Sequence, residues 1–121
     1  MSNFRIKSSF YPLSLTAYTK CNVELTLEIE NIGNSDLWTE CDVHVPEALS
    51  LAPDRSLQKG RLRIGIINPG ETRYGRCKVY SSSKSYPDVF PVKLVVYGFG
   101  KDGAIVAREE KTAHLRCERI G

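Results

Sequence analysis

Apolar and polar residues alternate strictly along residues 22–30. One parity of this segment carries the apolar side chains Val23, Leu25, Leu27 and Ile29. The other parity carries the polar side chains Glu24, Thr26, Glu28 and Glu30. A period of two is typical of a β-strand with one buried face and one solvated face, and it excludes an amphipathic helix, whose period is 3.6. The segment is therefore predicted to be a half-buried strand.

Similar alternation, or a short apolar run, recurs along the rest of the chain. Further strands are predicted at residues 10–17, 37–45, 62–67, 72–80, 89–99 and 104–117. The segments between them are rich in Gly, Asn, Pro and Asp, which favour turns. Residues 89–99 are the most apolar of these strands and are expected in the centre of a sheet.

Two segments depart from this regularity. In the last strand, charged residues interrupt the apolar parity, which predicts a β-bulge near Glu109 and Glu110. The serine-rich segment 81–85 has little to bury, so we expect a mobile loop there.

About seven short strands with near-regular turn signals and no convincing helix predict an all-β fold, an immunoglobulin-like two-sheet antiparallel sandwich. The chain has 121 residues, which is about the length of one domain. We therefore expect a single domain over residues 1–121, with its core at about 10–117.

Composition and charge narrow the class of protein further. Hydrophobic residues make up 41% of the chain, enough to build a core. The net charge is +3, well short of what phosphate neutralisation requires from a nucleic-acid-binding protein. No apolar run has the length of a signal peptide or of the roughly 20 residues that span a bilayer. A cytoplasmic protein without membrane insertion is expected, or an extracellular one if the chain is an excised fragment.

The four cysteines are too far apart in sequence to form close zinc-ligand pairs. They are Cys21, Cys41, Cys77 and Cys117. Reduced, buried thiols that pack as small hydrophobic groups are the expected state. If a disulfide exists, Cys21 and Cys77 are the first candidate pair, because the strands that carry them would be antiparallel neighbours.

Several turn motifs in the chain resemble those of prokaryotic immunoglobulin-like families. The motifs are Asn31-x-Gly33, Val43-x-Val45-Pro46 and Asn68-Pro69-Gly70-Glu71-Thr72. They are similar to motifs of the cell-adhesion-related CARDB-type domain and of a module attached to some α-galactosidases. The resemblance implies a seven-stranded sandwich that acts as a non-catalytic module of secreted or surface proteins, spacing domains or binding partners. It implies no catalytic residues.

Recognisable catalytic and metal-binding motifs are absent from the sequence. There is no Gly-x-Ser-x-Gly elbow, no phosphate-cradling glycine loop, and there are just two histidines. Glu40, Asp42 and His44 share a strand face, but a metal ion there would need ligands from a neighbouring strand, and a polar outer face explains them more simply. A cysteine nucleophile paired with a histidine stays open as an alternative. We expect no enzyme and no cofactor.

Basic and aromatic residues alternate on the outward parity of residues 72–80. They are Tyr74, Arg76, Lys78 and Tyr80. Such a face could stack bases and contact phosphates, which makes nucleic acid one possible ligand. In an immunoglobulin-like topology, however, this strand lies beside residues 22–30, whose outer face is acidic. Cross-strand pairing with those glutamates explains the pattern better than nucleic-acid binding does.

Three aromatic residues fall on the outward parity of their strands and provide the candidate site. Trp38, Tyr97 and Phe99 are expected on one sheet as an exposed patch, of the kind that marks contact surfaces. The alternative is that Trp38 folds over the end of the core. The leading hypothesis is a binding or assembly module for a protein partner or for a second copy of the chain, through this face or an edge strand. Carbohydrate binding by the same aromatic face is the second hypothesis.

Overall fold

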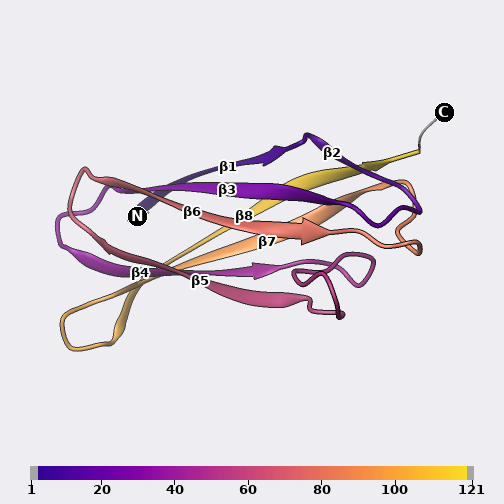
Figure 1. Cartoon of the computed structure of the whole chain (residues 1–121). Helices are drawn as coiled ribbons and strands as arrows, with labels where there is room; N and C mark the ends of the chain where they lie inside the picture. Colours follow the sequence, from indigo (N-terminus) through magenta and orange to yellow (C-terminus); the bar gives the residue numbers. More distant parts are fainter. Residues whose placement is uncertain (1–2, 120–121) are drawn as a thin grey trace.

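The computed structural model describes residues 3–119, which form eight β-strands. These are β1 (Phe4–Tyr11), β2 (Ser14–Thr16), β3 (Asn22–Asn31), β4 (Leu37–His44), β5 (Lys59–Ile67), β6 (Thr72–Tyr80), β7 (Asp88–Phe99) and β8 (Ile105–Glu118). They form two sheets packed face to face, a three-stranded sheet in the order β1-β3-β6 and a five-stranded sheet in the order β2-β8-β7-β4-β5 (Figure 1). The predicted all-β sandwich is confirmed, and no helix in the described part is long and apolar enough to cross a bilayer.

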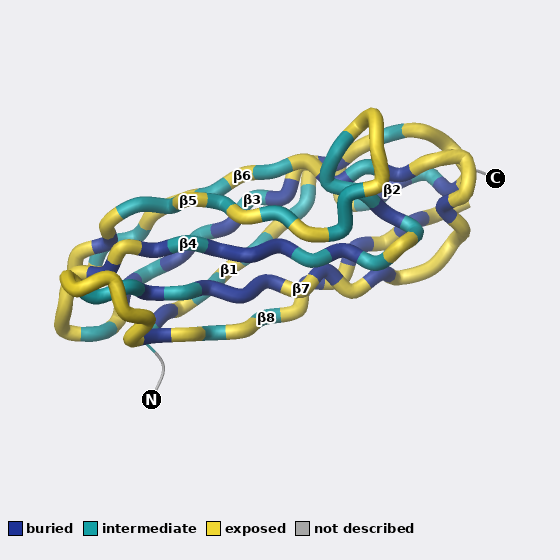
Figure 2. The backbone as a smooth tube through the Cα atoms, turned by 90° about the horizontal axis from the view of Figure 1, so that it is seen from below, coloured by how far each residue is buried: buried dark blue, intermediate teal, exposed yellow. Residues whose placement is uncertain are grey.

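The core lies between the two sheets and is built by the alternating strands. The apolar parity of β3 is fully buried, with each of its four side chains at most 1% exposed. β7 pairs with β8 on one side and with β4 on the other, so it occupies the predicted central position. Buried residues run along β4 and β7 in the middle of the five-stranded sheet, while β5 and β8 are more exposed (Figure 2).

The N-terminal segment differs from the strand predicted at residues 10–17. β1 begins at Phe4, whose ring is buried in the core, and pairs with β3. After the cis Tyr11–Pro12 peptide bond the chain crosses to the other sheet, where β2 pairs with β8 in parallel. The sequence pattern missed β1 because Ser8 occupies a position of the apolar parity. The core therefore starts at Phe4 and not near residue 10.

The bulge predicted near Glu109 and Glu110 lies elsewhere. β8 pairs in continuous register with β7 through both glutamates, and the irregularity falls between Gly98 and Phe99, opposite Val106. The charged side chains of Glu109 and Lys111 share the inward parity of β8. They are tolerated there because this part of β8 lies at the side of the sandwich, next to β1. Lys111 Nζ donates a hydrogen bond to the backbone oxygen of Ile6 on β1, 3.0 Å away.

The serine-rich segment 81–85 is not the loop with little to bury that we expected. Ser81 and Ser85 are 4% and 0% exposed. The Ser81 hydroxyl donates to the Thr19 carbonyl oxygen at 2.7 Å, and the Ser85 hydroxyl donates to the Ala48 carbonyl oxygen at 2.7 Å. Serine is small enough to enter the end of the sandwich and satisfy backbone groups there, which a pattern based on hydrophobicity does not register.

All four cysteines are free, and the pairing suggested for Cys21 and Cys77 is wrong. The register between β3 and β6 places Cys77 opposite Leu25. Cys21 lies four positions before Leu25, a separation of about 13 Å along a strand, which exceeds the reach of a disulfide. The two strands are antiparallel neighbours as predicted, but the register between them separates the thiols.

Candidate interaction face

The outer face of the five-stranded sheet carries a row of apolar side chains that crosses four strands. Trp38 on β4 is paired with Ile66 on β5 and with Phe99 on β7, and Phe99 is paired with Ile105 on β8. We call Ile66, Trp38, Phe99 and Ile105 the apolar row. Because cross-strand partners project to the same side of a sheet, these four side chains lie next to one another.

The apolar row is accessible to solvent. Ile66 is 54% exposed, Trp38 is 41% exposed and Ile105 is 57% exposed, while Phe99 is half-buried. Val106, which is displaced by the bulge in β8, is a further exposed apolar residue and follows Ile105 directly in the chain. Single exposed apolar residues are ordinary on a protein surface, but a contiguous group is typical of a contact site.

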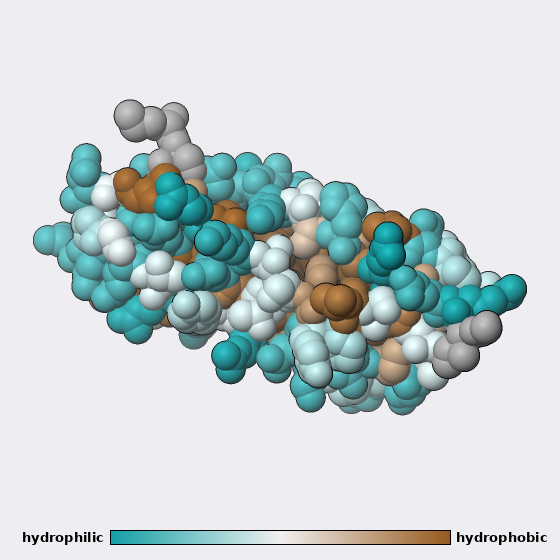
Figure 3. All heavy atoms as spheres, turned by 90° about the horizontal axis from the view of Figure 1, so that it is seen from above, coloured by the Kyte–Doolittle hydropathy of each residue, from teal (hydrophilic) through white to brown (hydrophobic). Residues whose placement is uncertain are grey.

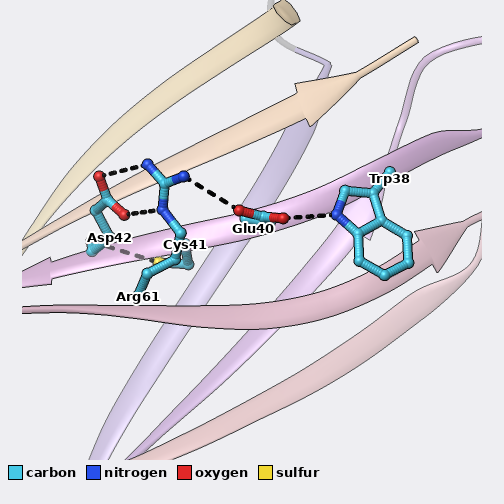
Figure 4. Close-up of polar contacts among 5 residues, drawn as sticks. All are labelled: Trp38, Glu40, Cys41, Asp42 and Arg61. Carbon is cyan, nitrogen blue, oxygen red and sulfur yellow. Dashed lines mark hydrogen bonds and ion pairs between the residues drawn. The ribbon is translucent and has the colours of Figure 1, made fainter. Parts of the chain in front are cut away.

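A polar network fixes the orientation of Trp38 (Figure 4). The indole Nε1 donates to Glu40 Oε2 at 2.7 Å. The other oxygen of Glu40 accepts from Arg61 Nη1 at 3.2 Å. Arg61 in turn makes a bidentate pair with Asp42, with distances of 2.6 Å to Oδ1 and 3.1 Å to Oδ2. The exposed indole is therefore held by a chain of hydrogen bonds along β4 and β5.

The network is ionic at neutral pH. Its hydrogen bond from Arg61 holds the pKa of Asp42 below the ordinary value for a carboxyl group, although the burial of Asp42 acts in the opposite direction. The same hydrogen bond raises the pKa of Arg61. The Arg61 guanidinium also lies 5.6 Å from the centroid of the Tyr97 ring, a cation–π contact that covers part of this tyrosine.

The structure brings the three predicted aromatic residues onto one face. Trp38 and Phe99 are direct neighbours, and Tyr97 lies in the next row, opposite Glu40. Trp38 projects into solvent and does not fold over the end of the core. Because Arg61 covers part of the Tyr97 ring, Tyr97 contributes less exposed surface to the patch.

Ile66 and Ile105 also belong to this face, and the sequence did not reveal them. A constant period of two would place Ile66 on the same side as Leu62 and Ile64. A bulge shifts the register between β4 and β5, where Gly65 has a φ of 101°, and this reverses the side to which Ile66 points. The glycine within an apolar run was the available signal.

The alternative basic–aromatic face lies on the outside of the three-stranded sheet. β6 pairs with β3 so that Lys78 faces Glu24, Arg76 faces Thr26 and Tyr74 faces Glu28. The Tyr74 hydroxyl donates to Glu28 Oε1 at 3.5 Å. Tyr80, the fourth residue of this set, pairs with Asn22. The register therefore sets Lys78 and Tyr74 opposite glutamates of the acidic strand but Arg76 opposite Thr26, and this side of the molecule is mostly hydrophilic (Figure 3).

The three potential metal ligands on β4 have cationic neighbours on the adjacent strands. Glu40 and Asp42 both accept hydrogen bonds from Arg61, and His44 is paired with Lys59 and with Lys93. Within residues 3–119, no three His, Cys, Asp or Glu side chains are placed to hold a metal ion.

Comparisons with known proteins identify the fold and not a family. No known family matches the chain, and no curated protein matches it in sequence. A similar solved structure is E. coli alpha-2-macroglobulin, with a TM-score of 0.64 and 15% identity over 98% of this chain and 7% of that chain. Another is the major pilin subunit BcpA of Bacillus cereus, with a TM-score of 0.60 and 10% identity over 94% of this chain and 40% of that one.

A third similar structure matches almost end to end. The FixG-related protein of Vibrio parahaemolyticus has a TM-score of 0.58 and 10% identity, and the match covers 98% of this chain and 99% of that chain. This chain is accordingly an immunoglobulin-like β-domain. Identities this low establish the architecture alone, and the finer resemblance to CARDB-type domains is not shown by any family match.

Proposed function

We propose that the chain is a non-catalytic binding or assembly module that contacts a protein through the outer face of its five-stranded sheet. The observation that carries this proposal is the apolar row, in which Trp38 and Phe99 sit between two exposed isoleucines on adjacent strands. Burying such a row against a partner removes apolar surface from water at little cost in desolvated polar groups.

The rigidity of Trp38 supports a binding role. An aromatic side chain that is already held in place loses little conformational freedom on association, and tryptophan is enriched among residues that dominate binding energy. The hydrogen bond to Glu40 holds the indole while leaving its ring exposed. Glu40, Arg61 and Tyr97 beside the row supply the polar rim that protein interfaces usually have.

The chemistry of the thiols supports a non-catalytic role. Burial raises the pKa of Cys41 to about 12 and that of Cys77 to about 11. Because the thiolate is the reactive form, both side chains are poor nucleophiles at neutral pH. Two of the similar structures, alpha-2-macroglobulin and the pilin, are chains in which a domain of this size is one part, as a module would be.

The proposal is tested by a change in the centre of the row. Static light scattering over a micromolar concentration range measures self-association, and affinity capture with the native protein as bait measures binding to a partner. Trp38→Ala is expected to weaken the observed association by about 30-fold or more, the loss typical of a central interface residue. Tyr74→Ala removes an exposed aromatic residue from the opposite sheet and should leave the association unchanged.

Circular dichroism and thermal unfolding serve as the check that both variants keep the native fold. A monomeric protein whose captured partners survive both substitutions equally would contradict the proposal. Binding on a glycan array that is lost in Trp38→Ala would instead assign the same face to carbohydrate.

A further inference from the structure

β5 is the edge strand of the five-stranded sheet, and its backbone offers hydrogen-bonding groups on one side. The sheet order ends at β5, whose strand partner is β4. Along Lys59–Arg63, no described strand pairs with the side of β5 that faces away from β4. Unpaired edges of this length can accept a further strand.

The register shows which residues of β5 direct their backbone outward. Val45 N donates to the Gln58 carbonyl oxygen at 2.9 Å, so these two residues form a hydrogen-bonded antiparallel pair. Such pairs alternate with non-hydrogen-bonded pairs along two antiparallel strands. Gly60 and Leu62 therefore point their N–H and C=O groups at β4. The groups of the intervening residues, Lys59, Arg61 and Arg63, point toward the open edge.

The same three residues place positive charge along that edge. Their side chains lie on the outer face of the sheet and are exposed. Arg61 is paired with Asp42 and Glu40, while Lys59 and Arg63 form no ion pair with any residue between 3 and 119. At Lys59 and Arg63, outward backbone groups that can pair with a strand therefore coincide with cationic side chains that can attract carboxylates.

The inner side of this edge is apolar. Leu62 and Ile64 are partly buried against the core and face Gly75 of β6 across the sandwich. A Cβ atom on Gly75 would lie 2.6 Å from Ile64 Cδ1, so β5 and β6 are in close contact here. A strand added beside β5 would have one face over this half-buried seam and the other face beside the cations.

We propose that the β5 edge binds an extended acidic segment of a partner protein, which adds to the five-stranded sheet as a further strand. Alternate residues of the segment carry carboxylates beside Lys59 and Arg63, on either side of Arg61, whose guanidinium is bound by Asp42 and Glu40. The residues between them are apolar and cover Leu62 and Ile64. Backbone hydrogen bonds supply affinity and the alternating side chains supply specificity in this kind of recognition.

The charge of the edge selects this occupant. A second copy of the chain pairing edge to edge would bring two rows of cations together, which is unfavourable and is how natural edge strands avoid self-association. A nucleic acid could contact the cations but could not use the backbone groups of β5. An acidic strand satisfies both features.

The corresponding edge of the other sheet is already partly occupied. Ser50 and Tyr80 exchange two backbone hydrogen bonds, of 2.9 and 2.7 Å, at the outer edge of β6. This short bridge shows that an added segment can pair on this side of the sandwich. With the edge of β6 partly occupied, β5 is the open edge on this side of the sandwich. This edge is a different surface from the apolar row, so the inference does not rest on the proposed function.

The role of charge in binding is tested with two fluorescein-labelled peptides. In one peptide glutamate alternates with valine, and in the other lysine alternates with valine. Fluorescence anisotropy should show that the acidic peptide binds and the basic peptide does not. The double variant Lys59→Glu, Arg63→Glu should weaken binding of the acidic peptide on the order of tenfold or more. Trp38→Ala should bind the peptide like the wild type, so failure of this inference is distinguishable from failure of the proposed function.

The role of backbone hydrogen bonds between β5 and the peptide is tested by comparing Arg63→Pro with Arg63→Ala. Both variants remove the charge, but only proline removes the outward N–H, so Arg63→Pro should bind several-fold more weakly. If Arg63→Pro does not fold, hydrogen exchange in the wild type gives the same information, because the amide protons of Arg61 and Arg63 should exchange more slowly with the acidic peptide bound. Equal binding by the two variants, unchanged exchange, or equally strong competition by a DNA oligonucleotide would overturn the proposal.

Discussion

Asn31 shows how much a single polar residue contributes to this sandwich. Its side chain is fully buried, and its amide nitrogen donates to the carbonyl oxygens of Ser35 and Ile67, at 2.8 Å each. Its side-chain oxygen accepts from Gly33 N at 2.9 Å. The Asn31-x-Gly33 motif is therefore more than a turn signal, because it joins the end of β3 in one sheet to the end of β5 in the other.

Replacing Asn31 with alanine should be strongly destabilising. The change leaves the carbonyl oxygen of the buried Ile67 without its donor, at a cost of about 1–3 kcal/mol, and it also removes the hydrogen bonds to Ser35 and Gly33. We expect Asn31→Ala to lower the free energy of unfolding by about 2–4 kcal/mol, measured by urea denaturation. Asn34→Ala, in the same turn but exposed, is the matched control and should change it by less than about 0.5 kcal/mol. Equal effects of the two substitutions would contradict this role.

At the level of elements, three strands converge on Gly98 of β7. A Cβ atom at this position would lie 2.9 Å from Phe4 Cζ, 3.0 Å from Leu37 Cδ1 and 3.2 Å from Ala107 Cβ. These neighbours come from β1, β4 and β8, so the missing side chain lets elements of both sheets approach β7. A glycine within a strand indicates such a close approach.

Gly98→Ala is expected to overpack this junction and to lower the free energy of unfolding by about 1–3 kcal/mol. Gly60→Ala serves as the control, since its Cβ would meet one flexible side-chain tip, Leu51 Cδ1, at 3.2 Å. In a double-mutant cycle, Phe4→Leu should relieve part of the strain in Gly98→Ala. Strictly additive losses in chemical denaturation would count against a direct contact between the two residues.

At the level of the whole molecule, closing the two sheets on each other decides the chemistry of the cysteines. Cys41 on β4 is fully buried, and its pKa of about 12 is due mainly to burial and then to the neighbouring charge of Asp42. Burial is also the main cause of the pKa of about 11 at Cys77. Since both pKa values lie far above neutral pH, both side chains stay thiols in the folded state.

Alkylation should therefore depend on unfolding. With iodoacetamide at pH 8, Cys41 of the native protein is expected to react at least about 100-fold more slowly than in the unfolded chain, because it must first be exposed. Mass spectrometry of peptides after a timed quench gives the rate at each cysteine, and the same chain in guanidinium chloride provides the reference. Labelling of Cys41 at the unfolded rate while circular dichroism stays native would refute this prediction.

The alternating pattern was sufficient to predict most strands and the side of the sheet that each residue occupies. In β3, β4, β6 and β7 the buried parity is the one that periodicity indicates, because the period of two is a property of each strand by itself. The same reasoning placed Trp38 and Phe99 on an outer face. Whether that face binds a partner stays a prediction.

Features that depend on contacts between strands were not accessible in this way. The switch from β1 to β2, the bulge at Val106, the buried hydroxyls of Ser81 and Ser85 and the separation of Cys21 from Cys77 all follow from register and packing. The amino-acid sequence alone thus determined the fold class and the inward side of the main strands, since both follow from local periodicity. Tertiary structure decided which side chains become neighbours, and hence the apolar row and the open β5 edge, because pairing partners are set by contacts between distant segments.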